Sequence, residues 1–86
     1  MLEEELEQEI DKWTQRIHVK RKTVVVLDQA QEHLLNNIDA YIADSKHFLE
    51  KKDMIRSFEA LVWAWSWIEI LEELGVLMSK TGTHAE

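Results

Sequence analysis

Hydrophobic and polar positions alternate with helical spacing along most of the chain. In the first quarter, apolar residues recur at three- and four-residue steps, at Leu2, Leu6, Ile10, Trp13 and Ile17. Acidic residues crowd the start of this segment and basic residues crowd its end, which suits the positive and negative ends of a helix dipole. The pattern therefore predicts a first helix that ends near Lys22.

A second periodic segment follows a short run of valines. Thr23 precedes the valines at 24–26, which have β-like character, but the sequence holds no second run of this kind that could pair with them. We therefore expect Thr23 to act as the N-cap of a second helix. Helical spacing then continues over residues 27–49, the strongest periodic signal in the chain. A tight turn is predicted at residues 51–53, with Asp53 capping a third helix.

The third segment, FEALVWAWSWIEILEELG at residues 58–75, places tryptophans at the alternate positions 63, 65 and 67. Such alternation would line one face of a strand, but the surrounding apolar residues have helical spacing and form two stripes. The stripes are Phe58, Leu61, Val62, Trp65 and Ile68 on one side, and Ala60, Trp63, Ala64, Trp67, Leu71 and Leu74 on the other. Because polar residues occupy only a narrow arc, we expect this helix to be the central element.

The predicted fold is all-α, a three-helix bundle in up-down-up order with a long helical hairpin formed by the second and third helices. The sequence has no proline, and its first glycine is Gly75, which we expect to be a left-handed C-cap with Val76 and Leu77 folding back on the helix. We expect a single helical domain over residues 1–77 and a flexible C-terminal tail over residues 78–86.

Composition and charge narrow the classes of function. A chain of 86 residues hides only about 60 to 65% of its unfolded surface, so self-association is one way for it to gain stability. Seventeen acidic against ten basic residues give a net charge of -7, which disfavours broad binding to nucleic acid or to an anionic membrane. The absence of cysteine excludes disulfides and thiolate ligands, and no apolar run approaches the roughly 18 residues of a membrane span. We expect a cytoplasmic protein.

The two apolar stripes of the third helix exceed what two short helices comfortably cover. One face of this helix should therefore meet a second chain, in a homodimer or on another protein. Trp67 lies beside the small side chains of Ala60 and Ala64, and we place it in the monomer core. Trp63 lies beside the polar arc and is the better candidate for an interface, because exposed tryptophans often anchor protein contacts. The candidate interface residues are Trp63, Ile70, Glu59 and Ser66.

Candidate chemistry is sparse. Asp44 and His47 have the spacing of the carboxylate–histidine pair of di-iron bundles, where two such helices and two more glutamates converge, but this chain supplies one such helix. The acidic group at residues 69–73 resembles a magnesium-binding helix, which needs a second acidic pair facing it, and Asp44 alone is a poor one. We therefore expect no cofactor, no metal and no catalytic residue. The basic segment RIHVKRK, residues 16–22, leaves open an accessory domain that contacts nucleic acid. A metal-dependent hydrolase is the third and least favoured alternative.

The segment YIADSKHFLEKKDMIRSFEALVWAWSWIEILEELGVL, residues 41–77, resembles the archaeal domain of unknown function family 357, a set of small helical proteins. The residues that match the family pattern are Tyr41, Asp44, Phe48, Asp53, Ala64, Trp67 and Gly75. Lys52 stands where the family has a turn glycine, and Ser45 and Ser66 stand where it has alanine and glycine. The resemblance implies a helical fold in which Tyr41, Asp44, Phe48, Asp53, Trp67 and Gly75 are structural. It implies no activity, because none is assigned to the family.

Overall fold

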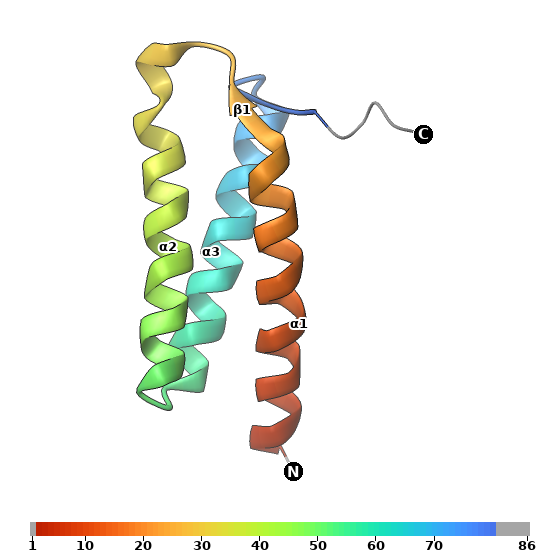
Figure 1. Ribbon diagram of the computed structural model, residues 1–86, viewed down its shortest axis with the longest axis vertical. Helices are drawn as coiled ribbons and strands as arrows, with labels where there is room; N and C mark the ends of the chain where they lie inside the picture. The colour runs from red at the N-terminus through yellow and green to blue at the C-terminus, as the bar shows by residue number, and fades with distance from the viewer. Residues whose placement is uncertain (1, 81–86) are drawn as a thin grey trace.

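The computed structural model describes residues 2–80 and consists of three long helices that run up, down and up (Figure 1). The helices are α1 (Leu2–Thr23), α2 (His33–Glu50) and α3 (Met54–Glu73). Between α1 and α2 lie the strand β1 (Val24–Val26) and the 3-10 helix η1 (Gln29–Gln31), and the strand β2 (Leu77–Ser79) follows α3. The prediction of three helices, with the second and third packed as a hairpin, is confirmed.

A small antiparallel sheet was not expected from the sequence. The strand β1 pairs with β2, so that Val24 lies opposite Ser79 and Val26 opposite Leu77. Thr23 is the last residue of α1, and its hydroxyl donates a hydrogen bond to the Lys20 carbonyl at 2.7 Å. The predicted N-cap role of Thr23 is therefore wrong. The partner strand has the sequence Leu-Met-Ser at the far end of the chain, and it lacks the β-branched run that would have marked it.

Two predicted boundaries move as a consequence of this sheet. The helix α2 begins at His33, after Asp28 has capped η1 by accepting a hydrogen bond from the Ala30 amide at 3.0 Å. The predicted tail begins too early, because Met78 and Ser79 belong to β2. Residues 81–86 of that predicted tail lie outside the described residues.

The end of α3 has the form predicted for it. Gly75 adopts a left-handed backbone conformation, with φ of 78°. Its amide donates to the Glu72 carbonyl at 3.1 Å, and the Val76 amide donates to the Leu71 carbonyl at 2.9 Å. These two bonds form a Schellman motif, which satisfies the last carbonyls of the helix. Val76 and Leu77 then pack on the core, so the chain folds back as expected.

The turn between α2 and α3 repeats this motif with a different residue. The Lys52 amide donates to Leu49 at 2.9 Å, and the Asp53 amide donates to Phe48 at 2.8 Å. Lys52 takes the left-handed conformation, with φ of 65°, although its Cβ makes that conformation unfavourable. Asp53 caps α3 as predicted, because its carboxylate accepts a hydrogen bond from the Arg56 amide at 3.2 Å.

The core lies where all three helices and the sheet meet around α3. Its buried hydrophobic residues are Ile10, Ile17, Val24, Leu35, Ile38, Ala60, Leu61, Ala64, Ile68, Leu71 and Leu77. Two buried serines join α2 to α3: the Ser57 hydroxyl donates to the Ser45 carbonyl at 2.8 Å, and the two hydroxyl oxygens are 3.0 Å apart. Because each hydroxyl has a partner, this polar contact fixes the hairpin without leaving a buried group unsatisfied.

Candidate interaction surface on α3

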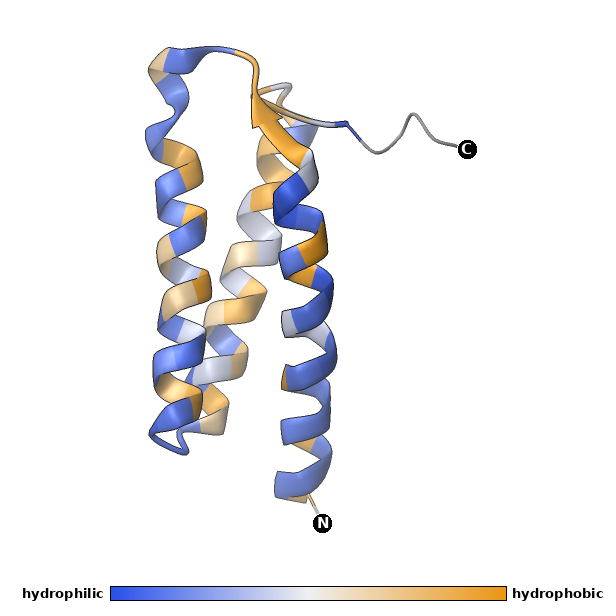
Figure 2. Ribbon diagram, viewed as in Figure 1, coloured by the Kyte–Doolittle hydropathy of each residue, from blue (hydrophilic) through white to orange (hydrophobic). Residues whose placement is uncertain are grey.

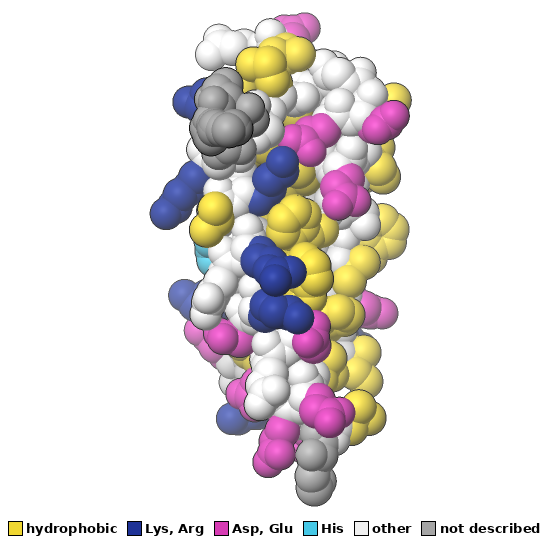
Figure 3. Space-filling view, turned by 90° about the vertical axis from the view of Figure 1, so that its right-hand side faces the viewer, with side chains coloured by type: hydrophobic (Ala, Val, Ile, Leu, Met, Phe, Trp, Pro, Cys, Tyr) yellow, Lys and Arg dark blue, Asp and Glu magenta, His cyan; other side chains and the backbone are white. Residues whose placement is uncertain are grey.

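One side of α3 is exposed to solvent although it is rich in hydrophobic side chains. Nine large hydrophobic residues are exposed within residues 2–80, and five of them belong to α3 or to its C-cap, Leu74. These five are Ile55, Val62, Trp63, Ile70 and Leu74, with exposed fractions between 47% and 69%. At roughly 100° per residue, these five positions fall within an arc of about 120° on one side of the helix. In Figure 3 hydrophobic side chains form a column along the right-hand edge of the molecule.

We call this side the open face of α3. It consists of Ile55, Glu59, Val62, Trp63, Ser66, Ile70 and Leu74. All four residues predicted for the interface lie on it: Trp63, Ile70 and Glu59 are exposed, and Ser66 is half-buried. Ile55 and Leu74, which extend the face towards both ends of the helix, were not among the predicted interface residues.

The open face lies between the two predicted stripes and coincides with neither. The helix α1 covers the stripe that contains Trp65, whose ring meets Trp13 of α1 at a centroid distance of 5.9 Å. The helix α2 packs along the other stripe, where Ala60 and Ala64 are buried and Trp67 is half-buried against the core. The helices α1 and α2 therefore cover most of both stripes, and the part of α3 left uncovered is the boundary between the two stripes.

Trp63 is held in place on the open face by α2. Its ring stacks on Tyr41 with a centroid distance of 6.3 Å and an angle of 18° between the planes, while 54% of the residue stays exposed. Beside this pair lies a shallow groove of about 200 Å³, which is lined in part by Tyr41, Asp44 and Phe48, three residues that match the family pattern. A large aromatic surface that is fixed before contact loses little conformational entropy on binding.

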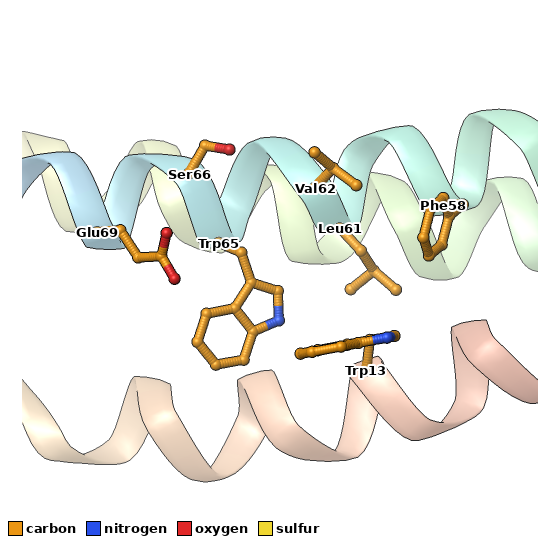
Figure 4. A pocket seen from close by; sticks show the side chains of 7 residues that line it. All are labelled: Trp13, Phe58, Leu61, Val62, Trp65, Ser66 and Glu69. Carbon is orange, nitrogen blue, oxygen red and sulfur yellow. The ribbon is translucent and has the colours of Figure 1, made fainter.

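A more enclosed apolar cavity lies between α1 and α3 (Figure 4). Its volume is about 320 Å³, and it is lined by Trp13, Phe58, Leu61, Val62, Trp65, Ser66 and Glu69. The Trp13 and Trp65 rings meet edge to face at an angle of 86°. The Trp65 Nε1 is buried and has no hydrogen-bond partner among the described residues, and Figure 4 shows that nitrogen on the side of the ring towards Trp13.

The outer side of Trp13 is surrounded by charged groups. The Arg16 guanidinium lies over the ring at 4.8 Å from its centroid. Glu9 accepts a hydrogen bond from Trp13 Nε1 at 3.1 Å and pairs with Lys12 at 3.2 Å. The hydrogen bonds from Lys12 and then Trp13 lower the pKa of the Glu9 carboxyl. Sequence spacing gave no sign that Trp13 would pair with Trp65, because the two residues meet only in the tertiary fold.

The residues considered for metal binding or catalysis are dispersed. Asp44, His47, Glu69 and Glu73 are exposed, and Glu72 pairs with Lys20 at 3.0 Å. Within residues 2–80 there is no group of three or more histidine, aspartate and glutamate side chains that could hold a metal ion. A hydrolytic metal site would need several carboxylates to converge.

The basic segment at residues 16–22 is largely engaged within the molecule. Lys20 pairs with Glu72, and Arg21 forms two hydrogen bonds to the Asp39 carboxylate, at 2.6 and 3.0 Å. Arg16 lies over the Trp13 ring. These contacts leave few cations of the segment available for phosphate. None of the helices within residues 2–80 has the length and apolar character needed to cross a membrane.

Comparisons with known proteins agree with this architecture. A family model described as "Protein of unknown function (DUF357)" matches residues 2–77. The structure is similar to the crystal structure of protein AF1782 from Archaeoglobus fulgidus, which is assigned to the same family, with 48% sequence identity and a TM-score of 0.83. The match covers 92% of this chain and 99% of that chain. No curated protein matches. The matches support the fold and indicate no activity.

Proposed function

The chain belongs to the DUF357 family of proteins of unknown function, and from this premise we propose that it is a non-enzymatic helical interaction module that self-associates through the open face of α3. The observation that carries the proposal is the row of five exposed hydrophobic residues along one side of a helix whose other sides are packed. A contiguous apolar surface of this kind on a soluble protein is typical of an interaction site.

The composition of the open face fits a protein contact. Trp63 is a large anchor near the middle of the helix, and it is already stacked on Tyr41. Ser66 lies one turn away and is small enough to let a partner helix approach closely. Tryptophan is enriched among the residues that dominate binding energy, and charged groups are enriched at the rim of an interface. Glu59 is an exposed charge within the open face, and Arg56 is an exposed charge near its N-terminal end.

The alternative of an accessory domain that contacts nucleic acid through residues 16–22 has weaker support. Two of the basic side chains are in ion pairs, and the net charge of -7 opposes the approach of phosphates. A metal-dependent hydrolase would need carboxylates that converge, which the described residues do not provide. The apolar face, by contrast, is a specific feature that neither alternative uses.

The proposal is tested by the molar mass of the protein in solution, measured by light scattering over a range of concentrations. We expect the wild-type chain to form a dimer and Trp63→Ala to weaken association by about 2 kcal/mol, or about 30-fold in Kd, with helix content unchanged by circular dichroism. Val19→Ala is the matched control, because Val19 is also an exposed hydrophobic residue but lies on α1. It should associate as the wild type does.

The salt dependence of association distinguishes self-association from binding to nucleic-acid phosphates. Association through apolar surface should hold or strengthen as salt rises, whereas contact with nucleic acid would weaken steeply. A wild-type chain that stays monomeric at high concentration would contradict self-association. So would a Trp63→Ala variant that associates as well as its parent.

A further inference from the structure

Apart from the capping carboxylate of Asp53, the charges in the first and last turns of α3 are opposite to those that a helix dipole favours. Arg56 lies in the first turn, which has no acidic residue, and Glu73 ends the helix, whose last turn has no basic residue. A helix is normally stabilised by acids at its N-terminus and bases at its C-terminus. Both residues therefore carry a small unfavourable interaction, and a compensating contact would explain why the charges are placed this way.

Contacts within residues 2–80 explain the position of one of the charges at the ends of α3 but leave two others exposed. Glu72 pairs with Lys20 of α1 at 3.0 Å, so its position is explained by the fold. Arg56 lies 3.6 Å from Asp53 of its own turn and its guanidinium is 5.9 Å from the centroid of the Phe48 ring, yet its side chain is still 67% exposed. Glu73 is exposed and has no ion pair within residues 2–80. A positive and a negative charge thus stand at opposite ends of the apolar open face, and both are available to a partner.

We propose that two copies of the chain pack their α3 helices antiparallel across the open face, so that Arg56 of each copy lies near Glu73 of the other. This arrangement rests on the self-association proposed above. Two-fold symmetry makes both ends equivalent, so one helix supplies both halves of the charge complementarity. A parallel arrangement would instead place the Arg56 side chains of the two copies beside each other at one end, and the two Glu73 side chains beside each other at the other end.

The positions of the charges also fit the apolar centre of the face. Glu73 follows Arg56 by seventeen positions, which corresponds to about 25 Å along a helix. The midpoint falls between residues 64 and 65, so a two-fold axis there brings Trp63 and Ser66 of both copies together at the centre of the contact. The same axis places Ile55 of one copy near Leu74 of the other, joining the two exposed ends of the face.

Charge reversal tests the orientation. At low ionic strength we expect Arg56→Glu and Glu73→Arg each to raise the dimer Kd about tenfold, because each places like charges together at both ends of an antiparallel contact. The double variant, Arg56→Glu with Glu73→Arg, should return Kd to within about threefold of the wild type, since it restores opposite charges. The reversed charges suit the helix dipole, so they do not threaten the fold.

Matched controls separate orientation from net charge. Lys46→Glu changes net charge as Arg56→Glu does, and Glu7→Arg changes it as Glu73→Arg does, but both lie on other helices. These controls should shift Kd much less than the variants on α3. A parallel dimer would leave like charges together in the wild type, in both single variants and in the double variant. Unchanged Kd across that series, or no recovery in the double variant, would overturn the antiparallel arrangement.

Cross-linking provides a direct measurement, because the wild-type chain has no cysteine. Ile55→Cys and Leu74→Cys chains of different tagged mass are mixed and oxidised, and the products are identified by mass. A disulfide between position 55 of one copy and position 74 of the other is expected. Disulfides only between identical positions, in a sample that light scattering shows to be dimeric, would refute the orientation and leave self-association standing. A monomeric wild type would refute both proposals.

Discussion

Two helices of similar length, α1 with 22 residues and α3 with 20, differ in almost every respect that decides what a helix contacts. The helix α1 has two buried residues, Ile10 and Ile17, and it carries acids in its first turn and bases in its last. The helix α3 has six buried residues, exposes five large hydrophobic side chains when its C-cap Leu74 is included, and has a base in its first turn and acids in its last. Figure 2 shows the contrast as a mostly hydrophilic α1 and a more hydrophobic α3.

The difference teaches which helix depends on its surroundings. The sequence of α1 suits a helix in water with one narrow packed stripe, because its charges favour its own dipole and its polar residues face solvent. The sequence of α3 suits contact on nearly all sides. The fold provides that contact on the sides of α1 and α2, and the proposed dimer provides it on the open face.

The largest effect on the free energy of unfolding should come from truncating a buried side chain of α3. Ile68 and Ile17 are both fully buried, but Ile68 belongs to the helix that packs against both other helices. We expect Ile68→Ala to lower the free energy of unfolding by about 3 to 5 kcal/mol and Ile17→Ala by about 2 to 3 kcal/mol. Urea unfolding at one low protein concentration measures both. A greater loss at Ile17 would reverse the ranking of the two helices.

The start of α3 should be sensitive to its cap. Because α3 lacks the acidic first turn of α1, the Asp53 carboxylate is the group that satisfies its Arg56 amide, at 3.2 Å. Asp53→Ala should lower the free energy of unfolding by about 0.5 to 2 kcal/mol. Glu4→Ala, in the first turn of α1, is a useful comparison that should cost less. A loss within experimental error at Asp53 would mean that the cap contributes little to this hairpin.

The two Schellman turns give a prediction of opposite signs. Lys52→Gly should raise the free energy of unfolding by about 0.5 to 1 kcal/mol, because glycine takes the left-handed conformation without the Cβ penalty. Gly75→Ala should lower it by about 1 kcal/mol, although nothing lies within 4 Å of the added Cβ. Thermal and urea unfolding of both variants would check the pair. Equal signs would show that backbone conformation does not decide these two positions.

The sequence determined much of the fold because its strongest signals are local. Helical spacing identified the hairpin, and Asp53 and Gly75 marked the start and end of α3, since caps act within one turn. The sheet was missed because Leu77–Ser79 has no strand pattern of its own and becomes a strand only by pairing with distant valines. The Trp13 and Trp65 contact was missed for the same reason. Trp63 and Ile70 could be placed on the open face from their position beside the polar arc, whereas exposure at Ile55 and Leu74 depends on where α1 and α2 stop covering α3.

The smallest expected effect on the free energy of unfolding comes from the charges at the C-terminal ends of α3 and α1. In the Trp63→Ala background, where association is weakened, Glu73→Lys should raise the free energy of unfolding by about 0.3 to 1 kcal/mol, because it places a cation at the C-terminus of α3. Lys22→Glu makes the reverse change in the last turn of α1 and should lower it by a similar amount. Glu7→Lys and Lys46→Glu, which lie outside the first and last turns of their helices, control for net charge.

If Glu73→Lys stabilises the monomer at low salt and also weakens association of the otherwise wild-type chain, then α3 gives up a favourable interaction with its own dipole for one with its partner. If Glu73→Lys does not stabilise the monomer, the reversed charges of α3 carry no intrinsic cost, and the contrast with α1 reduces to hydrophobicity.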